Sequence, residues 1–422
     1  MSKKLLIISF SMPPSSDIGV RRWVKFAKYL KQKGHLIKII AAHEHDPETS
    51  PWLKDAECLE EDLFFTNSGY PKYLGIRPQN FKDKVLYRVS LHYAKLRSGG
   101  NYYDKSNLWG PQLLKASRET IKKHDIKNVI CTIPPFKIAW HLLQLKKEFP
   151  HINFIVDYRD PWINNKTAFG FMHLSAARFQ TEKSAEKKVV QQYDKIIAVS
   201  EQMKEHFLNF IDETALNKKF IAIPNGFDSE DFVHKAYKVS SGKEKGFITV
   251  TFAGTFYDKS IHVLEKLIDS VNQIKADQSL GKNLLKFIFL GSMPQKAKDL
   301  VEANSHSFTF LGKKNLHQTY ELLANADYCS LFLTDDLNYS LSTKFYEYLA
   351  MQKPIISFSR EKGANAKFIE KHGVGIGVDF STMPSVISSL MRGETIVAFK
   401  SNIDYSAFDV KNLAKKVEDI LI

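Results

Sequence analysis

The chain alternates short apolar runs with amphipathic stretches along almost its whole length. Many of the apolar runs are nearly continuous, which is typical of parallel strands that helices cover on both faces. In the first half, the runs predict strands at Leu5–Phe10, Leu36–Ala41, Asn128–Ile133, Asn153–Val156, Lys195–Val199 and Phe220–Ile223. In the second half, they predict strands at Ile248–Ala253, Leu285–Leu290, Phe308–Leu311, Tyr328–Leu333 and Pro354–Ser357.

Several intervening stretches place apolar residues at helical spacing. They predict helices at Arg21–Lys33, Ile261–Ala276, Leu316–Ala324 and Ala366–His372. Strand–helix alternation in both halves predicts an α/β chain of two Rossmann-like, doubly wound domains with parallel sheets. The polar stretch 225–246 is rich in Gly and Ser and is the expected boundary, so we expect one domain at 1–224 and another from 225.

One long stretch, Glu44–Ser106, does not follow the strand–helix rhythm. It contains a basic amphipathic segment, Lys84–Arg97, with the sequence KVLYRVSLHYAKLR. Two interpretations of this segment stay open. It is either a helix packed on the core with a solvated basic face, or an insertion that contacts a membrane surface or the acceptor.

Length and composition narrow the class of protein. A chain of 422 residues is too long for one ordinary core, and 44% hydrophobic residues are ample for two. The three cysteines are far apart and form neither a metal-ligand spacing nor a disulfide framework, which favours a reducing compartment. The first apolar run, Leu5–Phe10, is short for a signal-peptide core, and none is long enough to span a bilayer. We therefore expect a soluble cytoplasmic protein.

The net charge of +14 is unevenly distributed. Residues 1–200 hold 33 Lys and Arg against 19 Asp and Glu, whereas residues 201–422 hold 27 of each kind. The asymmetry indicates an acidic partner for the first half: membrane headgroups, nucleic acid or a phosphorylated substrate. Ordinary solubilising charge is the alternative.

The stretch Tyr339–Ser357 carries the strongest chemical signal. The hydroxyl residues Ser342 and Thr343 precede a helix-type segment that holds Lys344 and Glu347. A helix N-terminus offers unpaired N–H groups and a partial positive charge, which suit phosphate, and Lys344 adds a cation. Glu347 is placed to accept hydrogen bonds from sugar hydroxyls. The alternative is an ordinary helix cap followed by a solvated ion pair.

Two loops of the first half carry further candidates. In PPSSDIGVRR, Gly19 permits close approach of a ligand, and Arg22 is a candidate residue for binding phosphate. In FIVDYRDPW, Asp157, Arg159 and Asp160 directly follow an apolar strand and therefore lie at the edge of the sheet where ligands bind. An Asp–Arg pair that only pins the loop is the alternative.

Three stretches, DYRDPW, PNGFD and TKFYEYLAMQKPII, resemble those of family 4 glycosyltransferases, and the resemblance extends over nearly the whole chain. It implies the GT-B fold, in which two Rossmann-like domains face each other across a cleft. It also implies that the C-terminal helix, about 404–422, returns to the N-terminal domain. The domain at 1–224 would then bind the acceptor, and the domain at 225–403 would bind the nucleotide sugar.

The resemblance also assigns residues. Its implied donor-binding set is Gly19, Arg22, Gly254, Thr255, Lys259, Gly291, Gly312, Ser342, Thr343, Lys344 and Glu347. Its implied acceptor-binding set is Asp157, Arg159 and Asp160, with Asp160 and Lys344 as catalytic residues. Two positions depart from the family pattern: Tyr339 replaces the first of two glutamates, and Thr255 replaces an arginine.

The expected function is that of a retaining glycosyltransferase, a hexosyl- or related transferase that moves a sugar from a nucleotide sugar to a saccharide or lipid-linked saccharide in cell-surface polysaccharide synthesis. No metal, cofactor or nucleic-acid partner is expected, and His43 and His45 have no Cys or further His nearby. The basic first half suggests a peripheral position on the cytoplasmic membrane face. A catalytically inactive partner subunit, or a nucleotide-sugar epimerase or hydrolase on the same fold, is the alternative.

Overall fold

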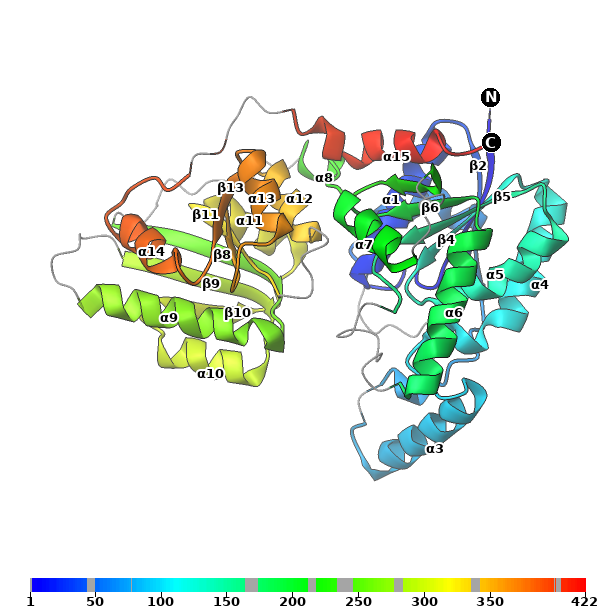
Figure 1. Ribbon diagram of the computed structural model, residues 1–422, viewed down its shortest axis with the longest axis horizontal. Coiled ribbons are helices and arrows are strands. Elements are labelled where there is room, and N and C mark those ends of the chain that lie inside the picture. The colour runs from blue at the N-terminus through cyan, green and yellow to red at the C-terminus, as the bar shows by residue number, and fades with distance from the viewer. Residues whose placement is uncertain are drawn as a thin grey trace. The chain divides into compact units, whose positions relative to one another are not determined.

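The structure is a computed structural model that describes residues 2–43, 50–76, 78–163, 174–211, 218–233, 246–276, 284–334, 342–397, 399 and 404–422. The chain divides into two units (Figure 1). The N-terminal unit consists of Met1–Pro224 and Val410–Ile422, and the C-terminal unit of Asn225–Asp409.

The N-terminal unit is built on a parallel sheet in which seven strands are described, in the order β3-β2-β1-β4-β5-β6-β7. The strands are β1 (Lys4–Ser9), β2 (Leu36–Ala42), β3 (Leu63–Thr66), β4 (Asn128–Ile133), β5 (Asn153–Tyr158), β6 (Lys195–Ala198) and β7 (Phe220–Ala222). The helices are α1 (Ile18–Gln32), α2 (Leu53–Ala56), α3 (Phe81–Arg97), α4 (Gly110–His124), α5 (Lys137–Glu148), α6 (Ala176–Gln192), α7 (Glu201–Ile211) and α15 (Val410–Glu418).

The C-terminal unit is built on a second parallel sheet, with six described strands in the order β10-β9-β8-β11-β12-β13. The strands are β8 (Phe247–Thr255), β9 (Leu284–Ser292), β10 (Phe308–Gly312), β11 (Tyr328–Phe332), β12 (Ile355–Phe358) and β13 (Gly375–Val378). The helices are α8 (Glu230–Val233), α9 (Ile261–Ala276), α10 (Gln295–Ala303), α11 (Leu316–Asn325), α12 (Thr343–Ala350), α13 (Ala364–Lys371) and α14 (Met383–Met391).

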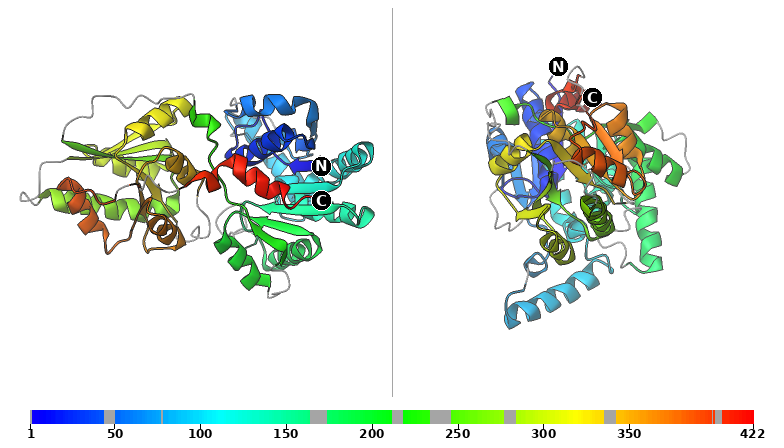
Figure 2. Two further views of the ribbon diagram at one scale, coloured as in Figure 1. Left: turned by 90° about the horizontal axis from the view of Figure 1, so that it is seen from above. Right: turned by 90° about the vertical axis from the view of Figure 1, so that its left-hand side faces the viewer.

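Both sheets are covered on both faces, as the continuous apolar runs predict. In the C-terminal unit, side chains of α9, α10 and α14 pack on one face of the sheet, and those of α11, α12 and α13 pack on the other. In the N-terminal unit, the core includes α1 and the last helix, α15, which lies beside α1 (Figure 2). The predicted α/β class and the two Rossmann-like parallel sheets are confirmed.

The predicted strands agree with the structure to within two residues at each end, but β3 and β13 were missed. β13 has the sequence GIGV, which resembles a loop. Its glycines allow close packing: a Cβ on Gly375 would lie 2.1 Å from the carbonyl oxygen of Ile355, and one on Gly377 would lie 2.4 Å from the Cβ of Ala366. β3 is an edge strand whose Phe64 and Phe65 are exposed, so its sequence lacks the pattern of a buried strand.

Candidate nucleotide-sugar site

In the C-terminal unit, the direction of the chain through the sheet reverses beside β8. The strands β8, β9 and β10 run in order towards one edge, and β11, β12 and β13 run in order towards the other. Ligands of doubly wound sheets bind at the carboxyl ends of strands at such a point. The carboxyl ends of β8, β9 and β10 hold Gly254, Gly291 and Gly312, which are all in the expected donor-binding set.

Two of these glycines let the backbones of neighbouring strands come unusually close together. Gly254 and Gly291 are register partners with φ values of 153° and 110°. A Cβ on Gly291 would lie 2.1 Å from the carbonyl oxygen of Gly254, so the position accepts only glycine. Gly312 has a φ of 70° with no atom within 4 Å of its ideal Cβ, so only its backbone conformation favours glycine.

The first turn of α12 brings Lys344 and Glu347 to the same edge. The Nζ of Lys344 lies 3.5 Å from an Oε of Glu347, whose side chain is 2% exposed, whereas the side chain of Lys344 is 28% exposed. The Lys344 side chain also lies against the end of β8, because a Cβ on Gly254 would be 3.5 Å from its Cε. Ser342 is the N-cap of α12 and its side chain does not cap the helix. The arrangement joins a helix N-terminus, an ammonium group and a buried carboxylate at one point.

A buried tyrosine that was absent from the expected set holds α12 in this position. The hydroxyl of Tyr348 accepts a hydrogen bond from the Ala253 amide (3.2 Å) and donates one to the Ser330 carbonyl (3.3 Å). It therefore ties α12 to β8 and β11, the two strands at the reversal point. Burial raises the pKa of Tyr348 well above its usual range, so the phenol stays neutral. The available sequence signal for Tyr348 was its position directly after Glu347 in the stretch YEYLA.

The remaining donor-site candidates lie close by in sequence. Thr255 ends β8, and its Oγ1 accepts a hydrogen bond from the Ser292 hydroxyl (3.2 Å). Lys259 is exposed in a 3-10 turn, Asp258–Ser260, directly before α9. Tyr339, the position of the missing glutamate, lies outside the described residues.

In the N-terminal unit, Arg22 and Asp157 form a buried ion pair. The Arg22 Nη2 lies 2.9 Å from an Oδ of Asp157, and the side chains are 5% and 0% exposed. The guanidinium also donates to the carbonyls of Ile223 and Pro224, each at 2.8 Å. Asp157 accepts further hydrogen bonds from Trp23 Nε1 (2.7 Å) and Thr132 Oγ1 (2.9 Å). These contacts give both residues a structural role, joining α1 to β5 and to the end of β7.

Asp160 has different surroundings from Asp157. It is half-buried, and no hydrogen bond joins its carboxylate to another residue in the described part of the chain. Burial raises the pKa of Asp160, and neighbouring Arg159 opposes this effect in part. Arg159 donates to the carbonyls of Ile133 and Pro134. A Cβ on Gly19 would lie 1.9 Å from the Arg159 Nη1, so Gly19 leaves space for Arg159.

The loop that carries Asp160 is anchored by two buried glutamates of α6. The amides of Trp162 and Ile163 each donate to Glu186 at 3.3 Å, and Trp162 Nε1 donates to Glu182 at 3.2 Å. Burial raises the pKa of Glu186 to about 8, so this carboxyl is mainly protonated at neutral pH. No local sequence pattern points to these glutamates, because they lie about 20 residues after the loop.

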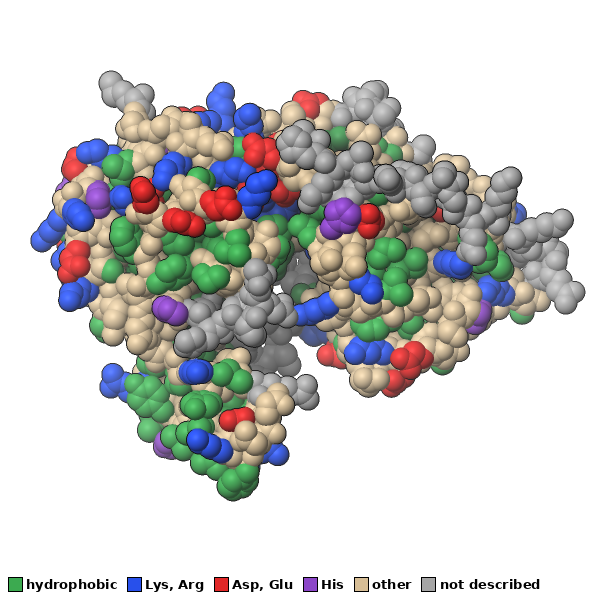
Figure 3. Space-filling view, turned by 180° about the vertical axis from the view of Figure 1, so that it is seen from behind, with side chains coloured by type: hydrophobic (Ala, Val, Ile, Leu, Met, Phe, Trp, Pro, Cys, Tyr) green, Lys and Arg blue, Asp and Glu red, His purple; other side chains and the backbone are tan. Residues whose placement is uncertain are grey.

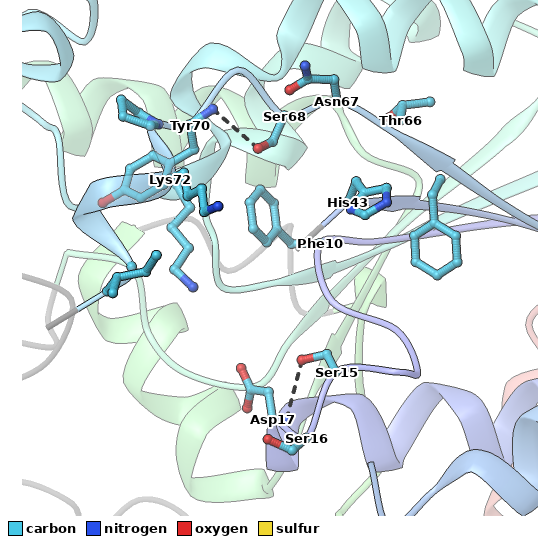
Figure 4. A pocket seen from close by; sticks show the side chains of 15 residues that line it. Phe10, Ser15, Ser16, Asp17, His43, Thr66, Asn67, Ser68, Tyr70 and Lys72 are labelled. Carbon is cyan, nitrogen blue, oxygen red and sulfur yellow. Dashed lines mark hydrogen bonds between the residues drawn. The ribbon is translucent and has the colours of Figure 1, made fainter. Parts of the chain in front are cut away.

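A cavity of about 750 Å³ opens at the carboxyl ends of β1, β2 and β3 (Figure 4). Phe10, His43 and Thr66 come from those strand ends. Lys72 and Lys105 supply positive charge to its lining. Polar, cationic and aromatic groups around a cavity of this size suit a saccharide or phosphorylated ligand. Among these residues only His43 was considered from the sequence, and then only as a metal ligand.

No group of three or more His, Cys, Asp or Glu in the described ranges is arranged to hold a metal ion. Within those ranges, no helix has the length and apolar character needed to cross a bilayer.

Comparison with known proteins matches part of the chain to a family. The family model for glycosyl transferases group 1 matches residues 248–391, which include all the described strands of the second sheet except the first residue of β8, Phe247. No curated protein matches the chain.

Solved structures of low identity match the chain over almost its whole length. A glycosyltransferase from Rickettsia africae is 14% identical with a TM-score of 0.54, covering 99% of this chain and 97% of that one. WaaG, a glycosyltransferase involved in lipopolysaccharide biosynthesis, is 12% identical with a TM-score of 0.55 and 99% coverage of both chains. The UDP-GlcNAc 2-epimerase from Methanocaldococcus jannaschii is 12% identical with a TM-score of 0.53 and the same coverage.

At these identities the structural matches show the fold, and the family match shows the sugar-transferring class. Residues 248–391 of the chain therefore match the group 1 glycosyltransferases, and the chain has the GT-B fold.

Proposed function

We propose that this protein is a retaining, hexosyl-type glycosyltransferase that moves a sugar from a nucleotide sugar to a saccharide or lipid-linked saccharide in cell-surface polysaccharide synthesis. One observation supports the donor site above all. Lys344, at the N-terminus of α12, lies between the glycine end of β8 and the buried Glu347. A diphosphate fits beside this lysine and the first amides of α12, and a ribose hydroxyl fits beside Glu347.

The proposed chemistry follows from the charges. Lys344 and the α12 amides stabilise the negative charge that develops on the departing diphosphate. Ser342 and Thr343 contribute the amides, and Lys259 is a second cation for the diphosphate. We assign Arg22 no phosphate contact, because its hydrogen bonds to Asp157, Ile223 and Pro224 already hold it inside the N-terminal unit.

The acceptor is proposed to bind in the N-terminal unit, in the cavity at the ends of β1, β2 and β3. Asp160 is the proposed contact or base for the acceptor hydroxyl, because its half-buried carboxylate has a raised pKa and no hydrogen bond within the described residues. Asp157 and Arg159 would position this loop. The basic charge of residues 1–200 favours an anionic acceptor, such as a lipid-linked saccharide at the cytoplasmic membrane face.

The first test is the affinity for nucleoside diphosphates. Glu347→Gln removes the charge of the carboxylate beside Lys344 and is expected to weaken binding of UDP, GDP or dTDP about tenfold, which corresponds to about 1.4 kcal/mol. Titration calorimetry measures the change for whichever nucleotide binds. Glu321→Gln on α11 is the matched control, since its side chain is 45% exposed. An unchanged affinity in Glu347→Gln would remove this residue from the donor site.

Incubation with a panel of UDP-, GDP- and dTDP-sugars separates transfer from the alternatives. Slow release of free sugar in the absence of acceptor supports a transferase. Accumulation of an isomerised sugar supports a nucleotide-sugar epimerase, the activity named for one protein of the same fold. Absence of any nucleotide binding supports a catalytically inactive partner subunit.

A further inference from the structure

The helix α3 exposes a continuous apolar stripe. Five side chains on one face are exposed: Phe81 (82%), Val85 (42%), Val89 (61%), Tyr93 (48%) and Leu96 (70%). Their spacing of four, four, four and three residues places them within an arc of roughly 120° at about 100° per residue. Single exposed apolar residues are common on protein surfaces, but a contiguous apolar patch usually marks an interaction site.

The opposite face of α3 supports the helix. Ala94 is buried, and the residues on this side, among them Tyr87, Ser90 and Leu91, are half-buried. The Asn80 side chain caps the N-terminus by accepting from the Asp83 amide (2.9 Å), and α3 contacts the turn Lys72–Leu74. Thus the inner face accounts for the position of α3, while the five side chains of the outer stripe remain 42–82% exposed among the described residues.

Basic residues border the stripe, mainly on one side. The helix has five lysines and arginines against one aspartate, and all five are exposed: Lys82, Lys84, Arg88, Lys95 and Arg97. On a helical projection at about 100° per residue, Lys84, Arg88 and Lys95 lie along one side of the stripe, Arg97 lies on the other, and Lys82 lies within its arc. Green and blue surfaces gather accordingly on the lobe at the bottom of Figure 3. Because both faces of α3 carry apolar residues, the helix lacks the one-sided pattern of a simple amphipathic helix.

An apolar stripe bordered by cations is complementary to the surface of an anionic bilayer. Apolar side chains enter the boundary between headgroups and acyl chains, while lysine and arginine remain at the level of the phosphates. A protein partner would have to match the stripe with apolar groups and the bordering cations with acidic groups. The lipid surface meets both conditions without a specific sequence.

We propose that α3 is the membrane-docking element of this protein and that it binds the cytoplasmic leaflet through anionic lipid headgroups. The inference deepens the proposed function, because the segment from Tyr70 to Ile76 both lines the acceptor cavity and includes the turn that contacts α3. A lipid-linked acceptor would then meet the cavity beside its own membrane. Vesicle binding requires neither donor nor sugar transfer, so it is tested separately from the proposed function.

The experiment uses the full chain and flotation with vesicles of phosphatidylcholine alone or mixed with phosphatidylglycerol. The wild type is expected to float with the mixed vesicles and to bind phosphatidylcholine vesicles several-fold more weakly. The triple variant Phe81→Gln, Val89→Gln and Leu96→Gln is expected to lose binding at least tenfold. Its matched control replaces three exposed apolar residues elsewhere by glutamine, Leu53, Leu284 and Ile422, and should float like the wild type.

A second pair of variants tests the charges. Lys82→Gln, Lys84→Gln and Arg88→Gln together should reduce binding to the anionic vesicles by about a hundredfold, at about fivefold per cation. Replacement of the exposed Lys122, Lys123 and Lys147 by glutamine should have a much smaller effect. Circular dichroism and thermal unfolding verify that each variant is folded.

Several results would overturn the proposal. One is a wild type that does not bind the mixed vesicles at low salt, and another is a Gln triple variant of the stripe that binds like the wild type. A third is a wild type that dimerises through the stripe, shown by a monomeric triple variant, while vesicle binding is absent. That result would assign the stripe to a second copy of the chain. Sugar transfer to a water-soluble acceptor should be equal in the wild type and the stripe variant.

Discussion

Asp157 and Asp160 lie three residues apart in one segment, yet the structure gives them opposite surroundings. Asp157 is fully buried and accepts hydrogen bonds from Arg22, Trp23 and Thr132. Asp160 is half-buried, and its carboxylate has no hydrogen bond to any other described residue. A buried charge that keeps its partner is stable, whereas a desolvated carboxylate without one costs free energy. Asp157 is therefore suited to a structural role and Asp160 to a chemical one.

This contrast predicts opposite results for two isosteric substitutions. Asp157→Asn leaves Arg22 buried without its counter-charge and should lower the stability of the N-terminal unit by about 3–5 kcal/mol. Asp160→Asn removes a carboxylate whose pKa is raised by burial, so stability at neutral pH should stay the same or increase while sugar transfer falls. Thermal unfolding and transfer assays of both variants check this. A strongly destabilised Asp160→Asn variant would contradict the assignment.

Glu186 gives a prediction for the pH dependence of stability. Its pKa is raised from 4.5 to about 8 in the folded chain, so the folded state binds a proton more tightly than the unfolded state. The contribution to stability is present at low pH and is lost as the pH rises from about 4.5 to 8, by at most about 1.4 kcal/mol per unit. In Glu186→Gln, the midpoint of thermal unfolding should depend less on pH over this range.

The matched control for this prediction is Glu148→Gln. Glu148 is paired with Arg118 on the surface, which lowers the pKa of the carboxyl, so the control should change the profile only in acid. If the unfolding midpoint of Glu186→Gln depended on pH between 5 and 8 as steeply as that of the wild type, Glu186 would be ionised in the folded protein.

At the scale of elements, the second sheet depends on glycines at the ends of β8, β9 and β10. Gly291 is required for steric and conformational reasons at once, since its φ is 110° and its ideal Cβ would lie 2.1 Å from the Gly254 carbonyl oxygen. Gly312 has a φ of 70° in open space. These strand ends form the floor of the proposed donor site, so their backbone geometry affects binding directly.

The two glycines therefore predict different effects of the same change. Gly291→Ala should cost about 3 kcal/mol or more, because it adds both a clash and a disfavoured φ, and should weaken nucleoside diphosphate binding. Gly312→Ala should cost only about 1 kcal/mol, from its conformation alone. Thermal unfolding and titration calorimetry measure both. Equal destabilisation in the two variants would mean that β8 and β9 separate readily.

At the scale of the whole molecule, the chain ends in the unit in which it began. α15 contributes Val410, Leu413, Ala414 and Val417 to the core of the N-terminal unit, against α1. Ile422 adds a contact with β4, because its amide donates to the Asn128 side chain (2.9 Å) and its carbonyl accepts from the same side chain (3.1 Å). The stability of the N-terminal unit therefore depends on residues that follow the C-terminal unit in sequence.

A core substitution in α15 should consequently affect the N-terminal unit. Leu413→Ala, at a fully buried position, is expected to lower the stability of this unit by about 2–5 kcal/mol while the affinity for nucleoside diphosphates is unchanged. Hydrogen exchange measured by mass spectrometry resolves the two units. Lys415→Ala on the exposed face is the control. Faster exchange confined to the C-terminal unit would contradict this account.

Much of the fold was predictable from local pattern, because buried parallel strands require apolar runs. The ranges of β4 and α9 were predicted to the residue. β3 and β13 were missed, since an exposed edge strand and a glycine strand both lack such a run. At the candidate site, the pair of Lys344 and Glu347 was predictable from its spacing, whereas Tyr348, Glu186 and the cavity residues depend on contacts between distant segments.

The sequence by itself determined the α/β class, the strands with continuous apolar runs and the residue types at the proposed donor site, because these follow from side-chain periodicity and local chemistry. Only the tertiary structure decided what each charged group contacts. It paired Arg22 with Asp157, left the Asp160 carboxylate without a hydrogen bond to another described residue and exposed the apolar face of α3. Pairing and burial are set by segments far apart in the chain, and a linear pattern does not encode which of them will meet.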